Sequence, residues 1–452
     1  MILKVLMNPI QLNYKNRHYF NYRNKHTLLV TSAEHYGAVI NTAFDFIPYL
    51  DTLKKYGFNL TRVFSGSYLE RKGDFNIEEN TLAPDLSSFI CPWKKIHGKY
   101  DLDKWDEKYF SRLKCFIKES FRRDIIVEYT FFCYFYNEHS WAMSPMNPAN
   151  NINISQNISR EDVYLMRNRN LFYYQKELIR KVCAELKREP NLYYEIINEP
   201  YSNHDSGDFN SWQDVMANEI LKTDKGRHMI ARNYQNKACL ISRGHPAVKI
   251  ANFHYAEPES VHLNYRLNIA LADDETGFKG QNEAPYRHEA WDFIMSGGSV
   301  FNNLDYSYTV NSPAGTAKIT GKTPGFGGEK FRRQISFLKK FIEGFDIVRL
   351  APLPEAVTGI GRPFTPDTRP AIIRIMAESG RQYAIYAREF GRQRKVYFGM
   401  PAGRYRYCMY DAVTGKKLKA GFFTLAGGPV SFDFKGGSGE YALSIRRIKY
   451  ER

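Results

Sequence analysis

The sequence predicts an α/β protein, a (β/α)8 barrel followed by a small antiparallel β-sandwich. Two patterns carry this prediction. Strand-like and helix-like segments alternate over about 320 residues, which is typical of a parallel sheet, and eight such repeats fit a closed barrel. After Val348 the helical periodicity ends, and short strands separated by turns follow. A doubly wound sheet is the alternative, but the glycine patterns GxGxxG and GxxxxGKS that usually mark one are absent.

Eight runs of β-branched and aromatic residues are the predicted barrel strands. They are 26–37, 58–68, 124–135, 193–201, 228–234, 249–258, 268–277 and 299–309. The intervening segments have apolar residues at helical spacing, and they are 44–57, 103–123, 171–189, 211–224, 285–298 and 329–345.

We therefore divide the chain into three parts. Residues 1–25 form an N-terminal lead-in with a small hairpin, 26–348 the barrel, and 349–452 the sandwich. The hairpin segment is expected either to cap the barrel floor or to lean on the sandwich. The sandwich is expected to brace the barrel or to bind glycan.

Charge and composition narrow the function classes. The chain has 64 Lys and Arg against 48 Asp and Glu, a net charge of +16, but the basic residues are spread along its length and no nucleic-acid-binding signature is present. The six cysteines are scattered without a CxxC pair, which argues against a metal site or disulfide framework. No apolar run approaches the roughly 20 residues of a membrane helix. We expect neither nucleic acid nor membrane as a partner, and a monomer or small homo-oligomer.

The apolar patch at the start of the chain is too short for a secretory signal core. Localisation is therefore left open: secreted or periplasmic only if a signal segment lies outside these 452 residues.

Polar side chains recur at the carboxyl ends of the predicted strands. In a barrel these ends meet on one rim, where catalytic groups are found. The residues are Glu34 and His35, Arg62, Tyr136, His139 and Trp141, Asn198 and Glu199, His254 and Tyr255, Asp273 to Glu275, and Asn303, Asp305 and Tyr306. Any one of them alone is more often structural, but their convergence favours an active site.

The segment Tyr193–Tyr201, YYEIINEPY, resembles the strand-four signature of clan A glycoside hydrolases, retaining (β/α)8 enzymes that include the cellulase-like family 5. The resemblance covers residues 25–345 in layout, although its specific motifs are short. It implies that Glu199 is the acid/base and Asn198 a contact to the sugar 2-hydroxyl. It also implies that Glu275, in ALADDETG, is the nucleophile and that Arg62, in LTRVF, supports it.

Two positions depart from the pattern of that family. His254 and Tyr255 match its strand-six His and Tyr, but they are adjacent here, whereas family 5 usually spaces them His-x-Tyr. Where the clan often has a strand-eight tryptophan, this chain has Tyr306.

The chemistry of glycoside hydrolysis agrees with two glutamates. One carboxylic acid protonates the leaving oxygen and one carboxylate attacks the anomeric carbon, and retention places them about 5–5.5 Å apart. We expect the negative neighbour to raise the pKa of Glu199 and Arg62 to keep Glu275 ionised. Strand alternation predicts that Asp274 points away from Glu275 and that Asp273 shares its face. Glu257 is the alternative nucleophile, and Glu195 is expected to be a buried partner of Glu199.

The prediction is a retaining glycoside hydrolase that cleaves β-glycosidic bonds of a poly- or oligosaccharide without cofactor or metal. The substrate-binding candidates are Asn198, His35, Arg62, His254, Tyr255, Trp141, Tyr136 and Tyr306, with Glu34 and Trp93 as further candidates. The alternative is a carbohydrate-binding protein that kept the barrel without turnover. The presence of both glutamates favours the enzyme.

Overall fold

A nearly closed eight-stranded parallel barrel forms the larger part of the protein, and this agrees with the predicted barrel. The computed structural model describes residues 7–200, 207–360, 371–390 and 394–448. The barrel strands follow each other in the order β4-β13-β12-β11-β10-β9-β8-β5. They are β4 (Leu29–Ala33), β5 (Leu60–Phe64), β8 (Ile126–Cys133), β9 (Leu192–Asn198), β10 (Ile230–Asn236), β11 (Val248–His254), β12 (Ala270–Thr276) and β13 (Val300–Leu304). Each lies within a predicted strand segment, or within two residues of one.

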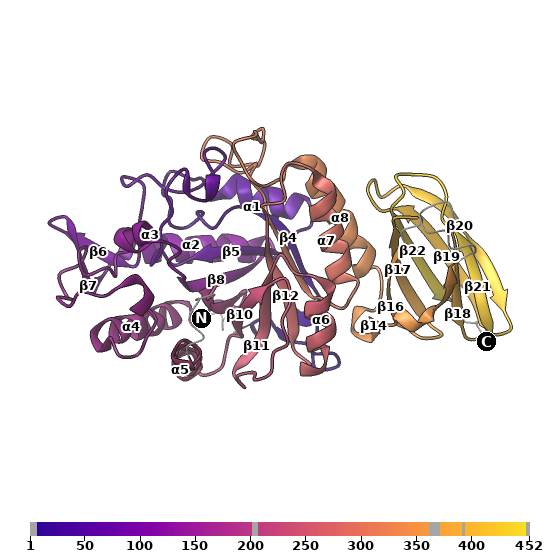
Figure 1. Ribbon diagram of the computed structural model, residues 1–452, viewed down its shortest axis with the longest axis horizontal. Helices are drawn as coiled ribbons and strands as arrows, with labels where there is room; N and C mark the ends of the chain where they lie inside the picture. Colours follow the sequence, from indigo (N-terminus) through magenta and orange to yellow (C-terminus); the bar gives the residue numbers. More distant parts are fainter. Residues whose placement is uncertain (1–6, 201–206, 361–370, 391–393, 449–452) are drawn as a thin grey trace, which may run out of the picture.

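Asn59 closes the barrel between its first two strands. Its backbone N–H donates to the Val30 carbonyl at 3.4 Å, and its side-chain oxygen accepts from the Val30 N–H at 3.0 Å. The helices pack around the outside, and α7 and α8 lie on the side that faces the second part of the chain (Figure 1). They are α1 (Phe46–Lys55), α2 (Glu107–Arg122), α3 (Glu138–Met143), α4 (Arg169–Leu186), α5 (Gly207–Asp224), α6 (Pro258–Asn264), α7 (Glu283–Ile294) and α8 (Glu329–Glu343).

Apolar side chains fill the amino-terminal half of the barrel, which we call the floor. Leu29, Leu60, Ile126 and Ile250 are buried there in one cluster. A three-stranded antiparallel sheet covers the floor from below and adds Phe20 to the same cluster. Its strands are β1 (Gln11–Leu12), β2 (Phe20–Tyr22) and β3 (Lys25–Thr27).

One predicted helix begins later than expected. The segment from Asp103 was expected to be helical, but α2 begins only at Glu107, after Asp106 caps it by accepting from the Lys108 N–H at 2.9 Å. The preceding residues form a hairpin of β6 (Trp93–Ile96) and β7 (Lys99–Trp105). A capping aspartate ends a strand here, and the cap decides where the helix starts.

The C-terminal part consists of two antiparallel sheets, as expected for a sandwich. One has the order β14-β16-β17-β22-β19-β20 and the other β15-β18-β21. Both contribute to one apolar core that includes Ile385, Phe398 and Leu443. The strands are β14 (Ala351–Pro352), β15 (Val357–Ile360), β16 (Ile372–Glu378), β17 (Gln382–Arg388), β18 (Lys395–Met400), β19 (Gly403–Asp411), β20 (Lys417–Leu425), β21 (Gly428–Asp433) and β22 (Tyr441–Arg447).

The sandwich is fastened to the barrel through helix α7. Trp291 stacks on Tyr386, with ring centroids 4.7 Å apart and an interplanar angle of 8°. Next to this pair, the Arg287 guanidinium donates to both oxygens of Glu440, at 2.9 and 2.5 Å. Stacked rings and a bidentate, mostly buried ion pair favour one fixed orientation of the two parts.

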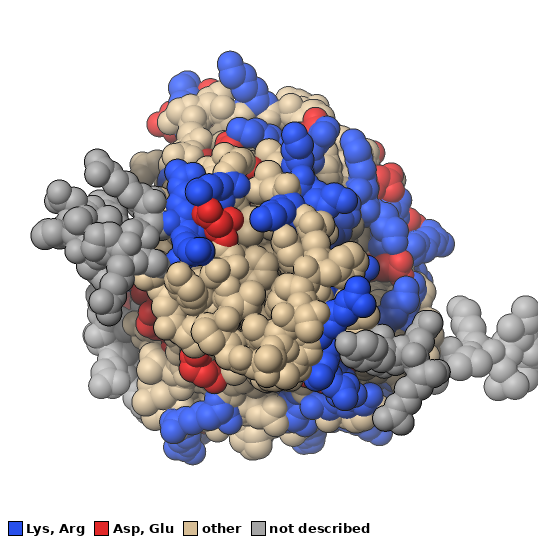
Figure 2. Space-filling model, turned by 90° about the vertical axis from the view of Figure 1, so that its right-hand side faces the viewer, with Lys and Arg blue, Asp and Glu red and all other residues tan. Residues whose placement is uncertain are grey.

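The outer end of the sandwich carries many basic side chains. In Figure 2, Lys and Arg surround a central area of uncharged residues, and acidic side chains are few. Among the helices of the described residues, none has the length and apolar character that a membrane span requires.

Candidate active site

Side chains from the ends of β9, β11 and β12 meet at the carboxyl-terminal rim of the barrel. A carboxylate oxygen of Glu199, one of Glu275 and a ring nitrogen of His254 all lie within 4.8 Å of one another. Nδ1 of His254 is 2.8 Å from Oε1 of Glu199 and 3.7 Å from Oε1 of Glu275. The structure therefore brings together three predicted site residues that are distant in the sequence.

Unusual backbone conformations orient two side chains of the site, those of Glu199 and Tyr255. Glu199 and Tyr255 have φ angles of 48° and 51°, in the left-handed region that side-chain-bearing residues rarely adopt. Neighbouring residues of a regular strand point to opposite faces. The left-handed turn lets both Asn198 and Glu199, and both His254 and Tyr255, face the site. Such strain costs on the order of 1–3 kcal/mol per residue and is typical of functional sites.

A β-bulge in β12 changes the direction of Glu275. Along the pairing with β11, Phe253 lies opposite Asp273 and His254 opposite Glu275, so one residue is extra. Asp274 keeps the inward face of Ala270 and Ala272, and the bulge turns Glu275 to the same side, where both carboxylates contact Arg62. The expectation from strict alternation was therefore wrong for Asp274. It was wrong for Asp273 as well, whose Oδ1 accepts from the Ala256 N–H, away from Arg62.

Two donors hold the carboxylate of Glu275. Nη1 of Arg62 donates to Oε2 at 2.9 Å, and the Tyr255 hydroxyl donates to Oε1 at 3.2 Å. The side chain of Glu275 is 9% exposed. The Arg62 guanidinium and the Tyr255 hydroxyl thus orient both oxygens of this carboxylate. Tyr255 reaches Glu275 although the His-x-Tyr spacing is missing, because its left-handed backbone redirects it.

Arg62 also ties the nucleophile candidate to strand β9. Its Nη2 donates to Oε2 of Glu195 and to Oδ1 of Asn198, both at 2.6 Å. The amide nitrogen of Asn198 in turn donates to the Tyr136 hydroxyl at 3.0 Å. Glu195 is thus a buried partner of Arg62, and it is linked to Glu199 only through other side chains.

The surroundings of Glu199 lower its pKa, contrary to our expectation. Burial opposes ionisation, but hydrogen bonds from His254 and Tyr136 outweigh it. The same contacts act in reverse on His254. Burial lowers its pKa, and the carboxylates of Glu275, Asp274 and Glu199 outweigh this and raise it to about 9. The expectation considered only the effect of the neighbouring carboxylate on the pKa of Glu199, whereas an imidazole lies between the two glutamates.

A second acid–imidazole pair borders the site. Nε2 of His35 is 3.1 Å from Oε2 of Glu70, and the Tyr68 hydroxyl donates to the other oxygen at 3.2 Å. The ring of His35 lies 5.7 Å from that of Tyr306. Burial raises the pKa of Glu70, with His35 opposing and Glu275 adding to the shift. The sequence prediction missed Glu70, because it follows β5 in an irregular loop without a motif.

A buried polar layer lies between this rim and the apolar floor. The amide nitrogen of Asn252 donates to Glu128, Glu195 and Asp274, at 2.7, 2.9 and 3.0 Å. All four side chains are buried. Burial, together with the charges of Asp274 and Glu195, raises the pKa of Glu128 well above its ordinary value.

Two groups of side chains have the spacing that a metal ion would accept. They are Glu199 with His254 and Glu275, and Glu128 with Glu195 and Asp274. In both groups, protein donors already bind carboxylate oxygens: Arg62 and His254 in the first, Arg62 and Asn252 in the second.

Several predicted sugar contacts lie elsewhere. Trp141 does not have the exposed ring that a predicted sugar contact needs. It is 3% exposed, and its indole N–H donates to the Ile158 carbonyl at 2.9 Å, so its ring belongs to the core. Trp93 is also buried, beside Trp105. Glu34 accepts from the N–H groups of Gly37 and Ala38 and so serves the backbone.

The alternative nucleophile, Glu257, is at the surface. Its side chain is 52% exposed, and its carboxylate is 3.8 Å from Nζ of Lys237. It precedes helix α6 as the N-cap residue. By contrast, Tyr136 and Tyr306 lie at the site, the first as a donor to Glu199 and the second beside His35.

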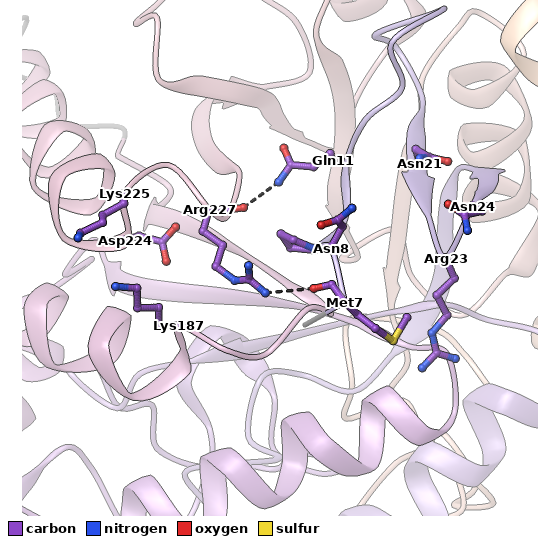
Figure 3. Close-up of a pocket in the computed structure, with 11 residues that line it drawn as sticks. Met7, Asn8, Gln11, Asn21, Arg23, Asn24, Lys187, Asp224, Lys225 and Arg227 are labelled. Atoms are coloured by element: carbon purple, nitrogen blue, oxygen red, sulfur yellow. Dashed lines mark hydrogen bonds between the residues drawn. The ribbon is translucent and has the colours of Figure 1, made fainter. Parts of the chain in front are cut away.

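A separate cavity of about 710 Å³ lies at the opposite, amino-terminal end of the barrel (Figure 3). Segments next to β1 and the ends of α4 and α5 line it. Arg227 donates there to the Met7 carbonyl, and Lys187 and Lys225 lie nearby. None of the predicted catalytic residues is among its lining residues.

Comparison with known proteins agrees with this architecture. No protein-family model matches the sequence, and no curated protein matches it. Among solved structures, a glycoside hydrolase family 5 protein from Bacteroides vulgatus superposes with a TM-score of 0.67 at 13% identity, over 97% of this chain and 94% of that one.

Two further structures show the same likeness. One described as a glycoside hydrolase gives a TM-score of 0.64 at 12% identity, over 98% of both chains. A family 5 mannosidase variant from Rhizomucor miehei gives 0.51 at 12% identity, over 75% of this chain and 99% of that one. At this level of identity the likeness establishes the fold. Over nearly its whole length, the chain has the barrel-and-sandwich fold of family 5 glycoside hydrolase structures.

Proposed function

We propose that this protein is a retaining glycoside hydrolase that cleaves β-glycosidic bonds of a poly- or oligosaccharide by double displacement. The observation that carries the proposal is the approach of Glu199 and Glu275: one carboxylate oxygen of each lies within 4.8 Å of the other. Retaining enzymes hold their two carboxyl groups about 5–5.5 Å apart, whereas inverting enzymes leave about 6.5–9.5 Å for a water molecule. The spacing therefore supports retention.

In the first step Glu275 acts as the nucleophile. Its carboxylate attacks the anomeric carbon while Glu199 protonates the departing glycosidic oxygen, which gives a covalent glycosyl–enzyme and a free alcohol. Arg62 and Tyr255 orient the attacking carboxylate through the hydrogen bonds described above. In the second step Glu199, now ionised, takes a proton from water, which attacks the same carbon and releases Glu275.

The proton for the first step is shared by Glu199 and His254. With a lowered pKa for Glu199 and a pKa of about 9 for His254, the pair holds one proton at neutral pH, mainly on the imidazole. The 2.8 Å hydrogen bond between Nδ1 and Oε1 lets this proton pass to Glu199 when negative charge develops on the leaving oxygen. The transfer leaves His254 neutral and Glu199 ready to donate.

A substrate panel tests the proposal. The full chain is incubated with aryl β-glycosides and aryl α-glycosides of the common hexoses, pentoses and uronic acids, and with a set of β-linked polysaccharides. The expected result is hydrolysis of at least one β-glycoside that is lost in the double variant Glu199→Gln/Glu275→Gln. Sugar binding without any hydrolysis would instead support a carbohydrate-binding protein and contradict the proposal.

A further inference from the structure

Asp274 belongs to neither of the two proposed catalytic positions, yet it lies directly behind them. Its Oδ1 is 3.6 Å from Nε2 of His254, and its Oδ2 is 3.3 Å from Nη2 of Arg62. The residue is fully buried, and it points inward, on the same face of β12 as Ala270 and Ala272. It therefore contacts the cation beside each proposed catalytic glutamate.

The ring of His254 thus lies between two carboxylates. Glu199 meets Nδ1 on the rim side, and Asp274 faces Nε2 on the inner side. Asn233 also meets Nε2, with its amide nitrogen at 2.6 Å. An amide can present nitrogen or oxygen and so suits both the neutral and the protonated ring, whereas a carboxylate favours only the protonated ring.

We propose that Asp274 is a positioning residue that holds the shared proton on the Glu199–His254 pair by supplying a negative charge behind the imidazole. Without that charge the pair would release its proton at lower pH. The inference deepens the proposed function, because the pair is the proton source of the first catalytic step.

The groups around the imidazole support this role. Burial raises the pKa of Asp274 to about 7 against the opposing charges of Arg62 and His254, so Asp274 is ionised in the range above pH 7 where His254 titrates. Other titratable or charged groups face Asp274 and His254 from several strands. They are Glu199 and Glu195 on or after β9, Glu275 on β12, Arg62 on β5, Glu128 on β8 and Tyr255 after β11.

The variant Asp274→Asn isolates the charge, because asparagine has the same shape. Its amide oxygen can still accept from Asn252 and Arg62, while its amide nitrogen faces Nε2 of His254 as a donor, which favours the neutral ring. Asp273→Asn is the matched control: it is the same buried substitution one residue away, and Asp273 accepts from the Ala256 N–H instead of contacting His254.

The experiment measures the pKa of His254 in the full chain by NMR of ¹⁵N-histidine-labelled protein between pH 5 and 10, with the signal assigned by its loss in His254→Gln. We expect Asp274→Asn to lower this pKa by roughly 1–3 units, the range for loss of a close opposite charge. The alkaline limb of kcat/KM should move down in the same direction, and Asp273→Asn should leave both unchanged. Should Asp274→Asn not fold, Asp274→Ser removes the same charge with a smaller side chain.

An unchanged pKa of His254 in the folded charge-removal variant would overturn the inference. So would a uniform loss of turnover at every pH with the alkaline limb in place, since that pattern indicates a merely structural role. The NMR titration needs no substrate. A downward shift together with a wild-type protein that hydrolyses no glycoside would therefore support the role of Asp274 and contradict the proposed function.

Discussion

The lower and upper halves of the barrel interior are built from the same strands, yet they contain opposite kinds of side chain. In β5, Leu60 belongs to the apolar floor, and Arg62, two residues later on the same face, contacts four acidic or amide side chains. In β8, Ile126 and Glu128 repeat this contrast. A layer of apolar side chains that stabilises the fold and a layer of buried charged side chains are therefore only two strand residues apart, about 6.6 Å.

The contrast between the apolar floor and the charged upper half indicates which side chains stabilise the protein. Burial of apolar side chains is favourable, whereas burial of charge is costly unless every group is paired. The upper half tolerates its charges because Arg62 and Asn252 bind several carboxylates at once. We therefore expect substitutions in the upper half to change chemistry first and substitutions in the floor to change stability first.

The largest effect is expected at Glu275, the proposed nucleophile. Glu275→Ala should lower kcat on an aryl β-glycoside by more than about a thousandfold, because it removes the carboxylate that would form the covalent bond to the sugar. The melting temperature should show that the variant is folded. The control is Glu257→Ala at the exposed alternative, which should keep its turnover; an active Glu275→Ala together with an inactive Glu257→Ala would reverse the assignment.

The next effect depends on the leaving group. Glu199→Gln should lower kcat/KM by about 10²–10⁴-fold for glycosides with poor leaving groups, since these need a proton in the transition state. Dinitrophenyl glycosides leave without that proton, so their kcat/KM should fall far less. Equal losses for both kinds of substrate would contradict the role of Glu199 as general acid.

In the floor the expected effect is on stability. Leu60→Ala should lower the free energy of unfolding by about 2–5 kcal/mol, because it removes a fully buried side chain and leaves a cavity. Turnover per folded molecule should stay close to wild type. Urea denaturation measures the change, with Leu263→Ala as the control, since Leu263 is 44% exposed and should cost no more than about 0.5 kcal/mol. A large loss of kcat with unchanged stability would contradict the division between floor and rim.

The smallest effect concerns the ion pair between barrel and sandwich. Burial opposes ionisation of Glu440, but Arg287 and His288 outweigh it and hold its pKa at about 2, below its ordinary value of 4.5. A depressed pKa contributes stability above about pH 4.5 that is lost as the pH falls toward 2. Wild type should therefore melt above Glu440→Gln at pH 6, and the difference should shrink steadily below pH 4.5. A constant difference down to pH 3 would show that Glu440 does not act through its charge.

Much of this architecture could be predicted from the sequence, because it depends on local patterns. The strand–helix alternation gave the barrel, and the runs ending in Asn198-Glu199 and Glu275 gave two strand ends that meet at the rim. A strand end fixes the position of a residue along the barrel axis, and this was enough to place Glu199, His254 and Glu275 together.

What remained hidden depends on backbone irregularities and on distant packing. The bulge that turns Glu275 to the side of Asp274 and the left-handed φ of Tyr255 break the alternation on which the prediction relied. The pairing of His35 with Glu70 joins residues from separate loops, and no periodicity announces it. The low pKa of Glu199 follows from donors that only the folded chain brings near it. Trp141 is a residue type that often stacks on sugars, but it is buried in the core.

The most direct test of the central claim is to trap the covalent intermediate. The protein is treated with an activated 2-deoxy-2-fluoro β-glycoside of a sugar that it hydrolyses, and its intact mass and peptide masses are measured. We expect the peptide that contains Glu275 to gain the mass of one fluoroglycosyl unit, and we expect no such gain in Glu275→Ala. Labelling of a different residue, or no labelling in a protein that turns over the parent glycoside, would contradict it.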